Sequence, residues 1–241
     1  MPLSPPFTYD DIADAYAAGV DSAPYNALYE RPAMLELLPP VAGTRVLDAG
    51  CGTGWYAAEL AMRGASVTAI DASAAMIGHA RRRFASAALA DAARLVELRV
   101  GDLEQPLSFA SDRAFDGIVS SLVLHYLFDW SATLAEFQRV LKPGGWLVCS
   151  THHPVAEAVR LDVARYLDVE PVEDHWKWVG TVRYYRRPLS AIVGALTRAG
   201  LAIERLVEPL PTEEFRTLKP RAYERLLRQP EFLLVRARSS R

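Results

Sequence analysis

Three glycines at alternate positions follow a short apolar run in the segment VLDAGCGTGW, residues 46–55. Gly50, Gly52 and Gly54 allow a tight backbone turn that comes close to a ligand. A helix that begins after such a turn offers free N–H groups and the positive end of its dipole to an anion. No Gly-Lys-Ser/Thr follows, which excludes a Walker-type phosphate loop. The spacing G-x-G-x-G is one residue short of the dinucleotide fingerprint, so it disfavours a dinucleotide but leaves it open.

Three aspartates lie at the ends of successive predicted strands, where open parallel sheets bind ligands. Asp71 comes 17 residues after the last glycine, where its carboxylate suits the ribose hydroxyls of either NAD or S-adenosylmethionine. Asp102 can accept a hydrogen bond from the exocyclic amine of adenine. Asp48 precedes the glycines, where a carboxylate suits an ammonium group and repels a pyrophosphate. Each could alone be a helix cap, but three at successive strand ends favour a nucleoside site with an amino-acid end.

The elements that must position these residues alternate between strand and helix from about residue 44. Apolar runs predict parallel strands over 45–50, 66–71, 94–100, 115–121 and 146–151. Helical spacing lies between them, and Ser73 is a favourable N-cap for one of these helices. Such alternation indicates an α/β fold whose parallel sheet has helices on both faces. The segments LAIERLVEP and EFLLVRAR also have strand character, so we expect the sheet to finish with an antiparallel pair.

Five ordered motifs resemble those of class I S-adenosylmethionine-dependent methyltransferases: VLDAGCGTGW, VTAIDASAAM, GDLEQPL, FDGIVSSLVLHYL and RVLKPGGWLVCSTHHP. The resemblance covers about residues 45–153 and is nearest to the small-molecule, ubiquinone/menaquinone methyltransferase-like group, "methyltransferase type 11". It implies a Rossmann-like, doubly wound, seven-stranded sheet, mostly parallel with the last strand antiparallel. It also implies S-adenosyl-L-methionine as cofactor and S-adenosyl-L-homocysteine as product.

The same resemblance implies which residues hold the cofactor. Gly50 and Gly52 would wrap its methionine part with Asp48 nearby, and Asp71 would hold its ribose. The remaining implied positions surround the adenine, the sulfonium or the N-terminal side of the site: Tyr16, Ala72, Met76, Asp102, Leu103, Ser121 and His125. Tyr16 belongs to a YDDIADAY pattern that is similar to the N-terminal cap of the family.

Methyl transfer from a sulfonium is an in-line displacement, for which the protein supplies alignment and a dry pocket. A general base is needed only where the acceptor carries a proton that it does not release unaided. His152 and His153 leave the fifth strand at the catalytic rim and are the candidate bases, with loop hydrogen bonding as the alternative. His125 can equally bond the backbone or cap the site. Two adjacent histidines without a third ligand do not indicate a metal site.

We expect the 241 residues to form a single methyltransferase domain, residues 1–241, in four parts. A helical cap (1–42) precedes the cofactor-binding core (43–151), and a substrate-side insertion (152–187) precedes the last helix and antiparallel strand pair (188–241). The insertion is rich in aromatic side chains: Tyr166, Trp176, Trp178, Tyr184 and Tyr185. They suit a flat or apolar acceptor, or a hydrophobic mini-core beneath a long loop.

The composition favours a small-molecule acceptor. With a net charge of −2 and a pI near 6.2, the chain has no basic field for phosphate backbones or anionic lipid, so we expect neither nucleic-acid nor membrane partners. Methylation of RNA or protein, and a non-catalytic regulatory protein that binds the cofactor, stay as alternatives; the oligomeric state is not indicated. Cys51 and Cys149 form no disulfide framework, and neither a signal-peptide pattern nor a membrane-length apolar run is present. These features predict a cytoplasmic protein.

Overall fold

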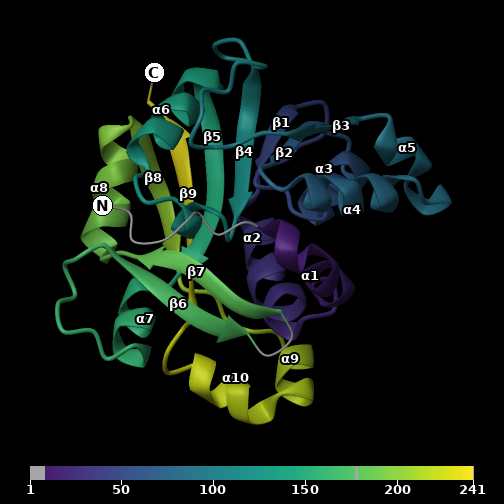
Figure 1. The fold of residues 1–241 in the computed structure, drawn as a ribbon. Coiled ribbons are helices and arrows are strands. Elements are labelled where there is room, and N and C mark those ends of the chain that lie inside the picture. Colours follow the sequence, from purple (N-terminus) through teal and green to yellow (C-terminus); the bar gives the residue numbers. More distant parts are fainter. Residues whose placement is uncertain (1–8, 177–178, 241) are drawn as a thin grey trace.

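The computed structural model describes residues 9–176 and 179–240; Trp178 and the first eight residues of the predicted cap therefore lie outside the described residues. Its centre is a seven-stranded sheet in the order β3-β2-β1-β4-β5-β9-β8 (Figure 1). Strands β1 to β5 pair in parallel, whereas β9 runs antiparallel to both β5 and β8. The strands are Arg45–Ala49 (β1), Ser66–Asp71 (β2), Val96–Val100 (β3), Phe115–Ser121 (β4), Leu141–His152 (β5), Leu201–Val207 (β8) and Phe232–Ser239 (β9). The predicted doubly wound sheet with an antiparallel last strand is confirmed.

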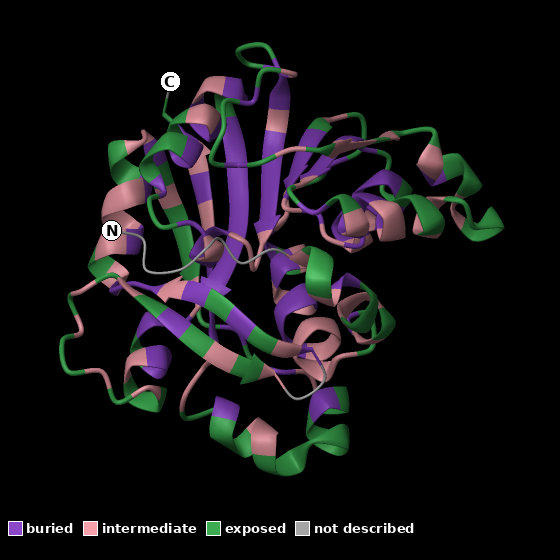
Figure 2. Ribbon diagram, viewed as in Figure 1, coloured by how far each residue is buried: buried purple, intermediate pink, exposed green. Residues whose placement is uncertain are grey.

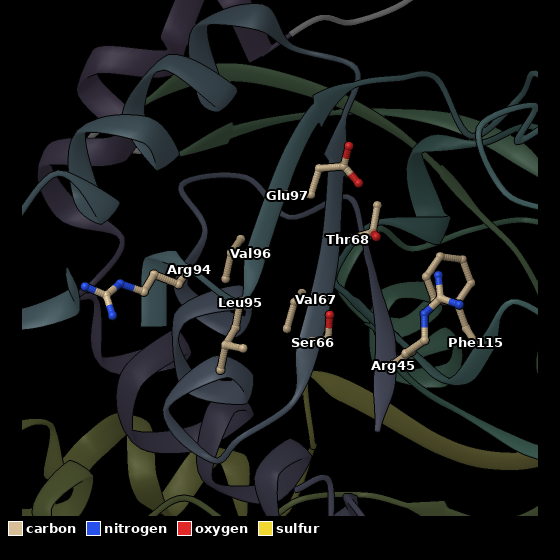
Figure 3. A pocket seen from close by; sticks show the side chains of 9 residues that line it. All are labelled: Arg45, Ser66, Val67, Thr68, Arg94, Leu95, Val96, Glu97 and Phe115. Carbon is tan, nitrogen blue, oxygen red and sulfur yellow. The ribbon is translucent and has the colours of Figure 1, made fainter. Parts of the chain in front are cut away.

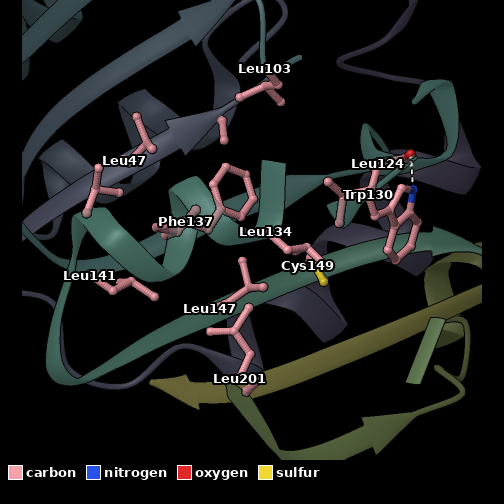
Figure 4. Packing of buried hydrophobic residues seen from close by; sticks show 14 of the residues in the cluster. Leu47, Leu103, Leu124, Trp130, Leu134, Phe137, Leu141, Leu147, Cys149 and Leu201 are labelled. Atoms are coloured by element: carbon pink, nitrogen blue, oxygen red, sulfur yellow. Dashed lines mark hydrogen bonds between the residues drawn. The ribbon is translucent and has the colours of Figure 1, made fainter. Parts of the chain in front are cut away.

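Alternation along the strands sends neighbouring side chains to two cores, one on each face of the sheet. Figure 2 shows that the central strands are largely buried, whereas the covering helices are partly exposed. Val46 packs on the face covered by α2, α3 and α4, whereas Leu47 packs on the face covered by α6 and α8. Figure 4 shows the second core, where Phe137 and Leu134 of α6 meet Leu147 of β5. The covering helices are Arg31–Leu37 (α2), Trp55–Met62 (α3), Ala74–Phe84 (α4), Ser131–Val140 (α6) and Leu189–Arg198 (α8).

Local signals set several of these boundaries. The Ser73 hydroxyl accepts a hydrogen bond from the Met76 N–H at 3.0 Å, so the predicted N-cap of α4 is confirmed. Gly200, with φ +83°, follows the last turn of α8. Strand β5 is longer than the predicted 146–151: it begins at residue 141, directly after α6 ends at Val140, and it includes His152. Short helical turns at Ala87–Leu89 (η3) and Ala90–Ala93 (α5) connect α4 to β3.

Several smaller elements gather beneath the carboxyl ends of the strands in Figure 1. The N-terminal cap contains η1 (Tyr9–Ile12), α1 (Ala13–Gly19) and a π-helical turn, η2 (Asn26–Glu30). The insertion contains α7 (Pro154–Arg160) and an antiparallel hairpin, β6 (Glu170–Trp176) and β7 (Gly180–Arg186), which the sequence did not predict. Helices α9 (Glu213–Leu218) and α10 (Pro220–Leu226) were also not predicted.

The hairpin packs against the cap and against η4 (Leu124–Tyr126), the short helix after β4. Its inward side chains Val172, Val182 and Tyr184 form a small core with Ile12 of the cap and Tyr126 of η4. Trp176 borders the same core, so the aromatic residues of the insertion do help to build a mini-core. Within the described part of the chain, no helix is long and apolar enough to cross a membrane.

Candidate functional site at the strand ends

The carboxyl ends of adjacent parallel strands bring the predicted residues to one edge of the sheet. The glycine turn follows β1, Ser121 ends β4, and His152 ends β5. Strand β4 lies between β1 and β5, so the glycine turn and the end of β5 are separated by the end of β4. Ser121 lies between them, because it pairs in register with Ser150 of β5. After these predicted roles, we call the region of the glycine turn the cofactor side of this edge and the region of His152 its acceptor side.

The glycine turn has two kinds of glycine. Gly50 and Gly52 both have positive φ, +81° and +51°. A Cβ on Gly50 would lie 2.3 Å from a methyl carbon of Val123, so the loop after β4 packs directly on the turn. A Cβ on Gly52 would meet nothing within 4 Å. Gly50 is thus required for packing, whereas Gly52 borders space that a ligand can occupy.

Asp71 fastens this turn from the end of the neighbouring strand. Its Oδ2 accepts the Gly52 N–H at 2.8 Å and its Oδ1 accepts the Ser73 N–H at 2.9 Å. Burial raises the pKa of Asp71, and these two N–H groups oppose that shift. Each carboxylate oxygen keeps a second lone pair, so Asp71 can also accept hydroxyls of a bound ribose.

The residues predicted around adenine lie beside Asp71, at the ends of β2 and β3. Gly101 donates its N–H to the Asp71 carbonyl at 2.9 Å, which places the next residue, Asp102, at the same edge. Asp102 is exposed and accepts the Glu104 N–H at 2.9 Å. Of the other three positions predicted to surround the adenine, Ala72 is exposed, whereas Met76 and Leu103 are buried.

Asp48 is a buried carboxylate with a vacant hydrogen-bonding position. Its side chain is 1% exposed, it accepts the Ala57 N–H of α3, and among the described residues its Oδ2 has no partner. Burial, with the nearby Asp71 charge, raises the pKa of Asp48 to about 7. Buried polar atoms are nearly always paired, so this oxygen suits a donor brought by a ligand, and an ammonium fits it best.

Two functional candidates were missed by the sequence analysis, Glu30 and Arg31. Glu30 is 1% exposed and accepts three hydroxyl hydrogen bonds at 2.6–2.8 Å, from Tyr56, Ser121 and Ser150. Burial raises the pKa of Glu30, and these donors oppose the shift. The carboxylate thereby ties the cap to α3, β4 and β5. The sequence did carry a signal for them: Glu30 and Arg31 are adjacent charged residues inside the largely apolar stretch ALYERPAMLELL, where charged side chains are unusual unless they are paired.

Arg31 is a buried cation close to the glycine turn. Its guanidinium lies 4.2 Å from the ring centroid of Trp55, the first residue of α3, and its side chain is 6% exposed. It donates to Asp21 at 3.3 Å (carbonyl) and 3.4 Å (carboxylate). Asp21 also pairs with Arg83, which donates to the Thr53 carbonyl at 2.8 Å. Arg31 is thus a buried cation held beside the start of α3 by Asp21 and Trp55, and a ligand carboxylate would have to share it with Asp21.

The cap brings Tyr16 to the same place. Its ring packs edge-on against Tyr9 with centroids 5.1 Å apart. Burial raises the pKa of Tyr16, and the charges of Glu30 and Asp71 add to that shift whereas Arg31 opposes it. The cap is also fastened to α4, because Asp10 accepts the Ser73 hydroxyl at 2.6 Å. Tyr16 thus lies among the charged groups of the cofactor side.

The acceptor side contains a stacked pair of imidazoles. The rings of His125 and His152 lie 4.1 Å apart with an interplanar angle of 18°. His125 is 2% exposed, and neither of its ring nitrogens has a hydrogen-bond partner among the described residues. Burial lowers the pKa of His125 well below its ordinary value, so this ring is neutral at pH 7. His152 differs, since its Nδ1 lies 2.9 Å from Oε1 of Glu157.

His153 has both ring nitrogens engaged at the start of α7. Its Nδ1 accepts the Ala156 N–H at 3.2 Å, which makes it the N-cap of that helix, and its Nε2 lies 2.7 Å from Glu208. Because Nδ1 accepts, Nε2 carries the proton and donates to Glu208. This geometry corresponds to the loop hydrogen bonding that was the alternative for His153. Of the two candidate bases, only His152 has its ring in the stacked pair with His125.

Other potential sites are poorer. A hollow at the opposite edge of the sheet is lined by the starts of β1, β2 and β4, including Arg45, Ser66 and Phe115 (Figure 3). It contains none of the residues predicted to bind or react. Across residues 9–176 and 179–240, no group of three or more His, Cys, Asp or Glu side chains is placed to hold a metal ion.

The core and the whole chain both match known proteins. The methyltransferase domain family model matches residues 47–149. An uncharacterized methyltransferase of Mycobacterium tuberculosis is 34% identical over 128 residues, which cover 53% of this chain and 60% of the relative. A malonyl-[acyl-carrier protein] O-methyltransferase of Serratia marcescens is 41% identical over 110 residues, 45% of this chain and 38% of that enzyme. The chain thus spans 60% and 38% of the length of these two curated relatives.

Solved structures extend the match over nearly the whole chain. The crystal structure of an S-adenosylmethionine-dependent methyltransferase from Mesorhizobium loti is 32% identical and has a TM-score of 0.73. The match covers 91% of this chain and 100% of that one. The likeness therefore extends well beyond residues 47–149.

Proposed function

Because this chain belongs to the S-adenosylmethionine-dependent methyltransferases, we propose that it transfers a methyl group from S-adenosyl-L-methionine to a small-molecule acceptor, leaving S-adenosyl-L-homocysteine. When bound, the cofactor supplies a methyl group on a positively charged sulfur, which a nucleophile can displace. The residues of this chain bind the cofactor, orient the acceptor and exclude water.

The observation that carries this proposal is the unpartnered Oδ2 of Asp48 beside the open face of Gly52. We assign Asp48 to the ammonium and Arg31 to the carboxylate of the methionine part. A buried anion and a buried cation, both near the glycine turn, match the two charges of an amino acid. A pyrophosphate would meet repulsion from Asp48, so the same groups argue against a dinucleotide.

Asp71 would hold the ribose, with Ala72, Met76, Asp102 and Leu103 around the adenine. Ser121 and His125 would lie on the sulfonium side, and Tyr16 would cover the site from the cap. Asp71 and Ser121 have second tasks in the fold, since they order the turn at Gly52 and bind Glu30. Loss of either side chain is therefore expected to change both cofactor affinity and local order.

Two features support a small acceptor. The cap and the hairpin pack together through Ile12 and Val182, and a site closed by them would suit a small molecule better than a polymer. The net charge of −2 supplies no long-range attraction for a nucleic acid. The histidines form part of the proposal: we carry His152 forward as the candidate base, because His153 caps α7.

The experiment that tests the proposal is a tritiated-methyl assay. Purified protein and labelled cofactor are incubated with an extract of the source cell, which is then separated into small molecules, RNA and protein. We expect the label in the small-molecule fraction, and its loss with the Asp71→Ala variant. Label confined to RNA or protein would replace this proposal with the macromolecular alternative.

A thioester-linked carboxylate is a second candidate acceptor. The relative from Serratia marcescens is named for O-methylation of a malonyl group on acyl-carrier protein, and it is 41% identical over the segment it shares. Malonyl-pantetheine, a small thioester, tests this candidate directly in the same assay. Transfer to malonyl-pantetheine at a rate comparable with the best acceptor in the extract would favour it.

A further inference from the structure

Two consecutive buried arginines end the hairpin, and only the first of them is fully paired. Arg186, the last residue of β7, donates to the Glu170 carboxylate at 2.9 Å. It also donates to three backbone carbonyls of the loop before β6, those of Arg165, Tyr166 and Asp168. Arg187 is 7% exposed and forms no ion pair with any described carboxylate. Buried charges are normally paired, so Arg187 is a cation that lacks its anion.

The contacts of Arg187 fix its guanidinium but use few of its N–H groups. The guanidinium carbon lies 4.4 Å from the centroid of the Trp130 ring, and Nη2 donates to the Leu127 carbonyl. Nε is buried and has no partner among the described residues. Nη1 has no hydrogen bond there either but is not fully buried, so this end of the group is open to solvent. A guanidinium has five N–H donors, and most of them are left for an anion.

The second unpartnered group, His125, belongs to the same loop. It lies two residues before Leu127, which binds Arg187, and its ring stacks on His152 of the acceptor side. Burial lowers the pKa of His125, and the charges of His152 and Arg187 add to that shift. The ring is therefore neutral and has one N–H to donate. Since neither ring nitrogen has a partner among the described residues, this N–H is also unused.

The carboxylates nearest to Arg187 already have other partners. Asp129 accepts the Ser131 N–H at 2.8 Å at the start of α6, and Glu157 lies 2.9 Å from Nδ1 of His152. Burial lowers the pKa of Arg187 to about 10, although the charges of Asp129 and Glu157 oppose the shift. The guanidinium is therefore still charged at neutral pH. With His125 neutral, Arg187 and His125 together present one positive charge.

We propose that the acceptor is a carboxylic acid, that its carboxylate binds Arg187 and His125, and that the methyl group goes to a different atom of the acceptor. This inference rests on the proposed methyl transfer and names the substrate class of the same site.

The unused donors match a carboxylate in charge and in number. A carboxylate brings one negative charge and two oxygens, which suit the free N–H groups of Arg187 and the single N–H of His125. A phosphate dianion would bring a second charge that no further cation of this pair meets, and a buried unpaired charge is costly. A neutral acceptor would leave the Arg187 guanidinium without an anion. A monoanion therefore fits best.

A carboxylate bound in this way is a poor methyl acceptor. Hydrogen bonds from a guanidinium stabilise the anion before the transfer, and that stabilisation falls as the oxygen gives up its charge to the methyl carbon. Only interactions that are stronger in the transition state than in the ground state accelerate a reaction. The pair of Arg187 and His125 therefore holds and orients the acceptor, while a second nucleophilic atom receives the methyl group.

The first test is the chemistry of the labelled product in the tritiated-methyl assay. We expect a product that an anion-exchange resin retains through a free carboxylate, with a label that survives mild alkali. A methyl ester, which alkali hydrolyses, would overturn this inference, and so would a product without a carboxylate. Either result would leave the proposed methyltransferase intact. An absence of any labelled product would instead defeat the proposed function itself.

The second test uses the acid found in that assay together with its carboxamide. We expect Arg187→Met to raise the KM for the acid by roughly 10²-fold and the KM for the carboxamide by only a few-fold. Arg187→Lys keeps the charge but not the planar fork, so its KM for the acid should be intermediate; this variant also serves if Arg187→Met does not fold. Equal increases for the acid and the carboxamide would show that Arg187 acts only through the fold, and would overturn the inference.

A matched control is available on the same hairpin. Arg183 of β7 is exposed and pairs with Glu173 at 2.8 Å, so Arg183→Gln removes an arginine charge away from the acceptor side. We expect this variant to keep the KM for the acid. An equal rise in that KM for Arg183→Gln and Arg187→Met would show a general effect of the hairpin, and would overturn the inference.

Discussion

The carboxylate of Asp71 accepts the backbone N–H of Gly52 at 2.8 Å, so the residue expected to hold the ribose also holds the turn expected to hold the methionine part. The second oxygen binds the Ser73 N–H, at the start of α4. One side chain thereby couples two parts of the cofactor site. Cofactor affinity should be more sensitive to this side chain than a ribose contact alone would suggest.

We therefore predict that Asp71→Asn weakens binding of S-adenosyl-L-homocysteine by more than tenfold, which is about 1.4 kcal/mol. The amide can satisfy only one of the two N–H groups and presents its own donors to the other. Isothermal titration calorimetry measures the change. Asp112→Asn, at an exposed position paired with Arg139 outside the site, is the control and should bind normally. Equal affinities of Asp71→Asn and the unaltered protein would contradict the prediction.

The two glycines of the turn should respond differently to alanine. In Gly52→Ala the new methyl group meets no protein atom, so the free energy of unfolding should fall only by the about 1–2 kcal/mol that the left-handed conformation costs. The methyl group should, however, occupy space that the cofactor needs and so prevent its binding. Gly50→Ala also meets Val123 and should lower the melting temperature further. Adding Val123→Ala to Gly50→Ala should recover part of that loss. Thermal unfolding and calorimetry check both, and equal melting temperatures of the two single variants would be inconsistent with the packing described.

Asp48 should make the stability of the free protein depend on pH. Its folded pKa of about 7 lies above the ordinary value of 3.8, so ionisation is disfavoured by folding. The cost is absent below pH 4, grows as the pH rises to 7 and is complete above that. Asp48→Asn does not ionise. The difference in melting temperature between this variant and the unaltered protein should therefore shift in favour of the variant as the pH is raised from 4.5 to 8. One pKa unit is about 1.4 kcal/mol, so a gain of several degrees is expected.

The same substitution should have the opposite effect on binding, because the amide offers an ammonium no charge. We expect Asp48→Asn to bind S-adenosyl-L-homocysteine at least tenfold more weakly at pH 8. A melting-temperature difference that is the same at both pH values would contradict the assigned burial of Asp48.

His153 should matter to stability more than to chemistry. Its ring caps α7, so His153→Ala should cost about 1 kcal/mol, whereas His153→Asn replaces one capping side chain with another and should cost less. Both variants should keep turnover to within a few-fold when folded. A loss of turnover in His153→Asn at unchanged stability would return His153 to the list of candidate bases.

Much of the fold could be predicted because the core strands carry strong local signals. The apolar runs of β1, β2 and β4 are buried on both faces of the sheet. Ser73 caps α4 through a hydrogen bond to Met76, only three residues away, so this signal is also local. The hairpin β6–β7 gave a weaker signal, because its exposed face is charged and its buried residues are three side chains of the small core together with the charged Arg186. Its packing depends on Ile12 and Tyr126, which are distant in sequence.

The candidate site divides in the same way. The aspartates could be predicted because the end of a parallel strand has a fixed place in the sheet. Glu30 could not, since its partners Tyr56, Ser121 and Ser150 come together only when the cap folds back over the strand ends. Glu157 was missed for a related reason: its contact with His152 requires the turn into α7 that His153 caps.

The central claim, a site for S-adenosylmethionine at the strand ends, is tested most directly by calorimetric titration of the purified chain with three ligands. S-Adenosyl-L-methionine and S-adenosyl-L-homocysteine should each bind once per chain, and NAD should not bind measurably. Tight binding of NAD, with no binding of the other two, would contradict the account.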